Sequence, residues 1–256
     1  MKAGILIVGS LYWDSHPERQ AWRSHCLMMD GAVRVHVPIR YGRVAKSRNE
    51  TYTMTIGAKG ALGTAVVVPC KPIATFYDLL TEACALWKAE QPNCADAKKI
   101  GSKVGSAEAW GCVGVLFRDA VRTLPEVTAL SSEWKRHWAA HGGDRVLPLN
   151  EHGQLAIDLP KTVLGQEIDF DIILATATRD RRAEDISAED VADRWVDRAH
   201  EYYFLNNVEQ GIRTAEDVKI WEQIKRRSPP WLSYPKYARA IEVLEALARV
   251  ADGHGS

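Results

Sequence analysis

The sequence lacks an excess of charge of either sign, because 33 lysines and arginines offset 33 aspartates and glutamates among its 256 residues. A balanced chain has no overall field that attracts nucleic acid or an anionic membrane, so we expect neither as a partner. A long apolar run is also missing, since the hydrophobic residues near the N-terminus give way to Trp13 and Asp14. We therefore expect no signal peptide or membrane span, and a cytoplasmic protein.

Cysteine is scarce and follows no metal-binding pattern. The five cysteines form no CxxC pair and no Cys/His cluster, so we expect reduced thiols and no bound metal. The chain also lacks GxGxxG, a Walker loop, HExxH and GxSxG. These absences argue against a nucleotide-dependent dehydrogenase, a P-loop enzyme, a zinc protease and a serine hydrolase, and we expect no cofactor.

The most distinctive stretch that is present lies near the N-terminus. Four aliphatic residues from Ile5 to Val8 predict a strand buried on both faces, after which Gly9 and Ser10 turn the chain. Backbone N–H groups and a serine hydroxyl in such a turn can hold a carboxylate or a phosphate. We expect Gly9, Ser10 and Leu11 to form a substrate-binding loop, although packing alone would also explain a strand of this kind.

Short strands joined by turns dominate residues 1–178. Alternating or continuous apolar residues predict strands at 33–37, 39–44, 51–56, 62–68, 109–117, 155–159 and 170–175. Helices are expected at 72–90 and 131–140. Because strands and helices do not alternate regularly, we predict an α+β domain with a small mixed β-barrel-like sheet and flanking helices.

The character of the chain changes near residue 179. A charge-mixed link at 179–185 precedes Ser187, which is a good N-cap for a long helix towards Gly211. Further helices are expected from Thr214 and from Pro235 or Tyr237. Residues 179–256 are thus predicted to form a helical extension packed on the first domain, and its aromatic residues could support a homodimer.

Two carboxylates lie near the apolar face of the helix expected at 72–90. At 100° per residue, Glu82 is at the edge of that face and Glu90 falls on it near the helix end. A partly buried glutamate has a raised pKa and suits general acid/base catalysis. The alternative is an ordinary solvated residue at the rim of the face.

Basic residues follow the predicted anion-binding loop. Arg40 and Arg43 lie on extended segments, with Lys46 and Arg48 close behind. Arginine suits bidentate recognition of a carboxylate, so Arg40 and Arg43 are candidate substrate-binding residues. The alternative is that they occupy the solvent-exposed face of a strand.

In their order along the chain, these motifs resemble the gamma-glutamylcyclotransferase-like superfamily. Residues 8–11 (Val-Gly-Ser-Leu) correspond to its Tyr-Gly-Ser loop, residues 62–68 to its later strand, and residues 78–82 (Asp-Leu-Leu-Thr-Glu) to its acidic segment. The similarity covers roughly residues 4–117. Val8 stands where the family has tyrosine, so the hydrogen bond of that phenol is absent.

The resemblance implies a cofactor-free enzyme acting on a small substrate that carries a carboxylate. The substrate's α-amine attacks its own γ-carbonyl, giving 5-oxoproline and a free amine, with Glu82 as acid/base. A second alignment places the acid/base at Glu126, through residues 110–113 and 124–126. The rival hypothesis is a non-catalytic small-molecule-binding or protein-interaction module that kept the fold.

Overall fold

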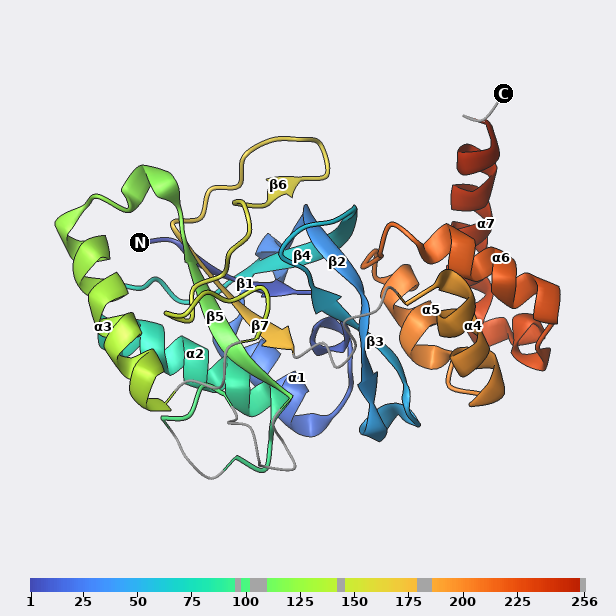
Figure 1. Ribbon diagram of the computed structural model, residues 1–256, viewed down its shortest axis with the longest axis horizontal. Helices are drawn as coiled ribbons and strands as arrows, with labels where there is room; N and C mark the ends of the chain where they lie inside the picture. Colours follow the sequence, from blue (N-terminus) through green and yellow to red (C-terminus); the bar gives the residue numbers. More distant parts are fainter. Residues whose placement is uncertain (95–97, 102–109, 142–145, 179–185, 254–256) are drawn as a thin grey trace.

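The computed structural model describes residues 1–94, 98–101, 110–141, 146–178 and 186–253. Its strands are β1 (Ala3–Ile7), β2 (Val33–Ala45), β3 (Thr51–Ile56), β4 (Leu62–Pro69), β5 (Gly111–Phe117), β6 (Lys161–Thr162) and β7 (Ile172–Thr178). Its helices are α1 (Pro17–Cys26), α2 (Phe76–Glu90), α3 (Pro125–His141), α4 (Ala188–Asp197), α5 (Tyr202–Glu209), α6 (Asp217–Arg227) and α7 (Ala238–Gly253). Figure 1 shows α4–α7 grouped at the end of the sheet where β2 and β3 lie, with α2 and α3 towards the other end.

The strands form one mixed sheet in the order β3-β2-β4-β1-β7-β5, with β6 beside β2. The predicted α+β class with flanking helices is therefore confirmed. The predicted closure into a barrel is not seen, because the edge strands β3 and β5 do not pair with each other within the described residues. The sheet instead bends at β2, where a bulge between Tyr41 and Arg43 interrupts the pairing with β3.

Strand β1 occupies the middle of the sheet. Every one of its residues is buried, as the run of aliphatic side chains predicts. It pairs antiparallel with β4 and parallel with β7, with Leu6 opposite Ala175. Because β1 and β7 run in the same direction, both strands end at the same edge of the sheet, and the residues that follow β1 lie beside the end of β7.

Helix α2 begins at a capping box, in which Thr75 accepts a hydrogen bond from the Asp78 N–H and the Asp78 carboxylate accepts one from the Thr75 N–H. The helix therefore starts at Phe76, four residues after the predicted Pro72. Its apolar residues pack in the core, with Leu79 and Leu86 fully buried. Each such side chain contributes roughly 1.5–3 kcal/mol on burial, which fixes the helix against the sheet.

Three other predictions need correction. The strand expected at 155–159 is absent, and only isolated bridges such as Leu149–Leu155 form there. The strands expected at 33–37 and 39–44 are a single strand, because β2 continues through Pro38 to Ala45. The long helix expected up to Gly211 is divided into α4 and α5, since Ala199 adopts a left-handed backbone conformation with φ of 47°.

The C-terminal helices α4 and α5 both contact the sheet domain, with α4 packed against β3. The Trp13 indole N–H donates to Asn207 Oδ1 at 2.7 Å, and the Met54 backbone N–H donates to the Tyr203 hydroxyl at 3.1 Å. The predicted charge-mixed link at 179–185, which contains the expected domain boundary, lies outside the described residues. Among the residues that are described, no helix is both long and apolar enough to cross a bilayer.

Asp217, at the start of α6, provides a test of how burial affects stability. Its side chain is only 2% exposed, and burial raises its pKa to about 7, against the opposing effect of hydrogen bonds from Thr214. In the unfolded chain an aspartate has a pKa of about 3.9. Above about pH 4 the unfolded chain releases this proton while the folded protein keeps it, so the free energy of unfolding falls as the pH rises towards 7.

We expect Asp217→Asn to remove this pH dependence, because asparagine has no proton to release. The variant's unfolding free energy should gain about 2 kcal/mol relative to the wild type between about pH 4 and pH 6. Urea denaturation of both proteins at several pH values in this range measures the difference. A difference that stays constant with pH would contradict the prediction.

Candidate functional site

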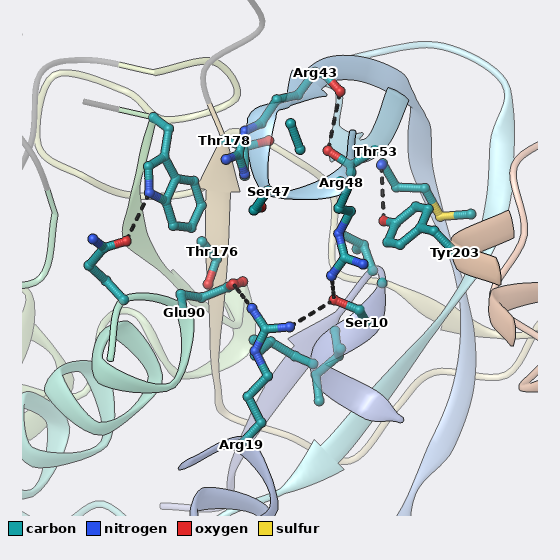
Figure 2. Close-up of a pocket in the computed structure, with 18 of the residues that line it drawn as sticks. Ser10, Arg19, Arg43, Ser47, Arg48, Thr53, Glu90, Thr176, Thr178 and Tyr203 are labelled. Atoms are coloured by element: carbon teal, nitrogen blue, oxygen red, sulfur yellow. Dashed lines mark hydrogen bonds and ion pairs between the residues drawn. The ribbon is translucent and has the colours of Figure 1, made fainter. Parts of the chain in front are cut away.

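A cavity of about 160 Å³ lies at the edge of the sheet where β1 and β7 end (Figure 2). Its walls come from the end of β1 and the following loop, α1, the second half of β2, β3, the end of α2, β7 and α5. Segments from both halves of the chain therefore meet here. The loop predicted to bind substrate, Gly9–Leu11, forms part of the wall.

Gly9 and Ser10 form a tight bend at the cavity. The backbone of Gly9 is extended, and residues Ser10–Tyr12 make a single 3₁₀ turn, in which the Tyr12 N–H donates to the Gly9 carbonyl at 3.2 Å. A Cβ atom on Gly9 would lie 2.6 Å from the hydroxyl oxygen of Tyr203, closer than any ordinary contact. The close approach of α5 thus requires glycine at this position.

Arg48 anchors this side of the cavity. Its side chain is largely buried, with the residue 8% exposed, and donates hydrogen bonds to Ser10 Oγ at 2.6 Å and to the Tyr202 hydroxyl at 2.8 Å. Its guanidinium also lies 4.6 Å from the centre of the Tyr203 ring. A guanidinium fixed by three groups is a preorganised site for a carboxylate.

Arg19, on α1, connects the loop to the opposite wall. It donates to Asp14 Oδ2 at 2.5 Å and to Ser10 Oγ at 3.2 Å, and its other terminal nitrogen is 3.8 Å from Glu90 Oε2. Burial alone would raise the pKa of Asp14. The His16 N–H and the neighbouring arginine charges outweigh burial and lower that pKa, so Asp14 is a charged partner for Arg19 at neutral pH.

Glu90 is the last residue of α2 and the one acidic residue that lines the cavity among the described residues. Its side chain is 18% exposed, so it is accessible from the cavity but shielded from bulk water. Figure 2 shows its carboxylate across the cavity from Arg48 and Tyr203. A carboxylate in this position can exchange a proton with a bound molecule.

The structure does not bring Glu82 to this cavity. Glu82 is 4% exposed and is buried near Cys70, at the opposite end of β1 from the Gly9 bend. Burial raises the pKa of Glu82, as expected from its place on the helix, but Glu82 does not line the cavity. The other candidate, Glu126, is exposed in the first turn of α3 and also lies outside the cavity wall.

The two predicted arginines are separated. Arg43 lines the cavity, and its guanidinium stacks on Trp110 with 4.2 Å to the ring centre. Arg40 instead lines a second cavity of about 550 Å³, between β2 and the N-terminal ends of α4 and α6. Only Arg43 of this pair is therefore placed to act with the Gly9–Leu11 loop.

Several cavity residues are not apparent from the sequence patterns. Arg48 was noted only as part of a basic loop, while Thr176 and Thr178 extend β7 beyond the predicted strand end at 175. The alternation of alanine and threonine at 175–178 is a strand signal that could have identified them. Tyr203 has no local signal, because only the packing of α5 places it here.

No group of three or more His, Cys, Asp or Glu side chains within the described ranges is arranged to hold a metal ion. Comparison with family models, with curated proteins and with solved structures gave no match for this chain. The function is therefore argued from the geometry and chemistry of the cavity.

The contact between Gly9 and Tyr203 gives a prediction about packing. We expect Gly9→Ala to lower the unfolding free energy by about 1–3 kcal/mol, because the new methyl group overlaps the Tyr203 oxygen. Tyr203→Phe removes that oxygen and leaves the next atom 3.6 Å away, an ordinary contact. Tyr203→Phe alone should cost about 1–3 kcal/mol, since the Met54 N–H loses its acceptor.

The double variant should therefore be more stable than the sum of the two single changes predicts, by about 1 kcal/mol. Urea denaturation of the four proteins measures this coupling. Strictly additive losses would mean that the alanine methyl group is accommodated by movement of the loop rather than blocked by the phenol.

Proposed function

We propose that this chain is a cytosolic enzyme of the gamma-glutamylcyclotransferase-like type, which converts a γ-glutamyl-type amide into 5-oxoproline and a free amine. One observation carries the proposal. A single carboxylate, Glu90, shares a small cavity with the Gly9–Ser10 bend and with two arginines, Arg43 and Arg48.

The arginine side of the cavity would bind the α-carboxylate of the substrate. The Arg48 side chain is fixed by hydrogen bonds to Ser10 and Tyr202, so it would lose little conformational entropy when a substrate binds. The Arg43 guanidinium is positioned by stacking on the Trp110 ring. This arrangement would direct the rest of the substrate towards Glu90.

Glu90 would then act as the acid/base. Its carboxylate takes a proton from the α-ammonium group, and the free amine attacks the γ-carbonyl carbon, so that a C–N bond closes a five-membered ring. The backbone N–H groups of Gly9 and Ser10 would stabilise the oxyanion that forms. Glu90 returns the first proton to the leaving nitrogen and takes the second proton from the new ring nitrogen. The original amide bond then breaks, the oxyanion becomes a carbonyl again, and the free amine takes up the second proton.

The reaction needs little further chemistry from the protein, because both reacting groups belong to one molecule. Orientation of an intramolecular attack can supply roughly 7–11 kcal/mol of the barrier. A small cavity that holds both ends of a glutamyl group is suited to this role. No water, metal or cofactor enters the balanced reaction.

The test is to incubate the purified protein with a panel of γ-glutamyl amines and peptides and to measure 5-oxoproline by mass spectrometry. The proposal predicts release of 5-oxoproline and of the matching amine in equal amounts. Absence of 5-oxoproline with every member of the panel would reject the catalytic function.

A non-catalytic binding module is the second candidate, and the charge of the cavity favours it. Three arginines, Arg19, Arg43 and Arg48, line the cavity against one carboxylate. Such a site would retain a small carboxylate without turning it over. Homodimerisation through α4–α7 also remains a proposal, which the mass of the protein in solution tests.

A further inference from the structure

Arg19 joins three segments of the chain at the cavity. Its Nε–H donates to the carbonyl oxygen of Ala89 at 3.3 Å, and one terminal nitrogen donates to Ser10 Oγ at 3.2 Å. The other terminal nitrogen is 3.8 Å from Glu90 Oε2. The side chains of Arg19 and Glu90 are 16% and 18% exposed, so they meet largely away from bulk water. One guanidinium therefore connects α1, the bend after β1 and the last two residues of α2.

Most of the Arg19 guanidinium is already used by protein groups. A guanidinium has five N–H groups in a planar fork. Three of those of Arg19 donate to Ala89, Ser10 and Asp14, and the remaining terminal nitrogen lies beside Glu90. Little of this guanidinium is left for a ligand. Arg19 is therefore better suited to holding the cavity walls in place than to binding a substrate.

The contact with Ala89 acts on the end of α2. The last four carbonyl groups of a helix have no partner within it, and the Ala89 carbonyl is one of these. Arg19 supplies its hydrogen bond, and a cation at this end also interacts favourably with the helix dipole. Glu90 is the next residue, so the same guanidinium holds both its backbone and its carboxylate. Figure 2 shows the Arg19 guanidinium between the Glu90 carboxylate and Ser10.

We propose that Arg19 is a positioning residue, which sets the separation between the Gly9–Ser10 bend and the Glu90 carboxylate. Its effect on turnover rests on the proposed function, in which the bend stabilises the oxyanion and Glu90 transfers the proton. Such a reaction depends on this separation, since a displacement of about 1 Å can lower a rate about 10²-fold. The contact of Arg19 with Glu90 does not rest on that function and is observable without turnover.

Arg19→Met tests the effect on turnover, because methionine fills the apolar part of the space and removes the donors. With a γ-glutamyl amine as substrate, we expect kcat to fall about 10²-fold and KM to change by less than about threefold. KM should hold because Arg43 and Arg48 still bind the carboxylate. A raised KM with nearly unchanged kcat would identify Arg19 as a substrate ligand and overturn the inference.

Two further variants separate positioning from charge and from a general loosening of the loop. Arg19→Lys keeps the charge but replaces three nitrogens by one, so kcat should stay at least about tenfold below the wild type. Arg23→Met is the matched control on α1, because Arg23 donates to the carbonyls of Leu11 and Asp14 in the same loop. It should lower kcat by less than about threefold. Wild-type turnover in Arg19→Lys, or equal losses in Arg19→Met and Arg23→Met, would overturn the inference.

The side-chain Nε–H resonance of Arg19 tests the contact without turnover. In a proton–nitrogen correlation spectrum, Arg19→Lys identifies this resonance by its loss. Glu90→Gln removes a charge 3.8 Å from a terminal nitrogen of Arg19, so we expect the resonance to shift. Glu82→Gln makes the same change earlier on α2, outside the cavity wall, and should leave the resonance in place. An unshifted resonance in Glu90→Gln would overturn the inference.

The inference and the proposed function can fail separately. A shifted Arg19 resonance in Glu90→Gln, with no 5-oxoproline released by the wild type, would support the contact and reject the enzyme. Release of 5-oxoproline by the wild type, with wild-type kcat in Arg19→Met, would support the enzyme and reject the positioning role.

Discussion

Replacing Glu90 by glutamine should abolish the release of 5-oxoproline from a γ-glutamyl amine. Glutamine keeps the size of the side chain but cannot take up the ammonium proton, so we expect the turnover rate to fall by about 10²–10⁴-fold. The binding of 5-oxoproline should change much less, since the arginine side of the cavity is untouched. Single-turnover assays with mass-spectrometric detection, combined with calorimetry, separate the two effects.

Glu82→Gln is the matched control, because it makes the same change on the same helix. Glu82 is buried away from the cavity, and burial raises its pKa. We expect turnover to stay at the wild-type level and the melting temperature not to fall. Loss of turnover in Glu82→Gln, or full turnover in Glu90→Gln, would reject Glu90 as the acid/base.

Replacing Arg48 by methionine should lower the unfolding free energy by about 3 kcal/mol and remove carboxylate binding. Arg48 is buried and joins the Ser10 hydroxyl to Tyr202 on α5, and its guanidinium is 3.6 Å from Asp14 Oδ2. Methionine fills the apolar part of the space but leaves these polar groups without their donor. Urea denaturation and calorimetry with L-glutamate measure the two losses.

The control for this change is Arg198→Met. Arg198 also forms an ion pair, 3.3 Å from Glu50 Oε2, but both side chains are about half exposed. A solvent-exposed pair contributes roughly 0–1 kcal/mol, so the variant should remain close to the wild type in stability and in binding. Similar small losses in both variants would show that Arg48 does not hold α5 against the loop.

The pattern of the sequence predicts the sheet well where one strand is buried on both faces. The run of aliphatic residues from Ile5 to Val8 predicted β1, and the threonine alternation at 51–56 matched β3 along its whole length. It failed at 155–159, where an apolar alternation of five residues forms only isolated bridges. Alternation shows that one face is buried, but a partner strand must lie alongside for a ladder to form.

The helical part shows the same limit. The pattern of N-cap and first-turn residues located the helices after Ser187, Thr214 and Tyr237. It did not reveal the break at Ala199, since alanine is a strong helix former. Ala199 has the left-handed conformation at the junction of α4 and α5, and Tyr202 and Tyr203 of α5 form hydrogen bonds with Arg48 and Met54.

By itself, the sequence determined a central buried strand, a glycine-serine bend that follows it, and an amphipathic helix with two glutamates near its apolar face. The helix pattern placed both Glu82 and Glu90 near one apolar face, about 80° apart around the axis, and the resemblance selected Glu82, with Glu126 as the alternative. Only the tertiary structure decided which glutamate lines the cavity, since Glu82 and Glu90 are about 12 Å apart along the axis, which separates one end of β1 from the other. The parallel pairing of β1 with β7 then places Gly9 and Ser10 near Thr176 and Thr178 in the wall of one cavity.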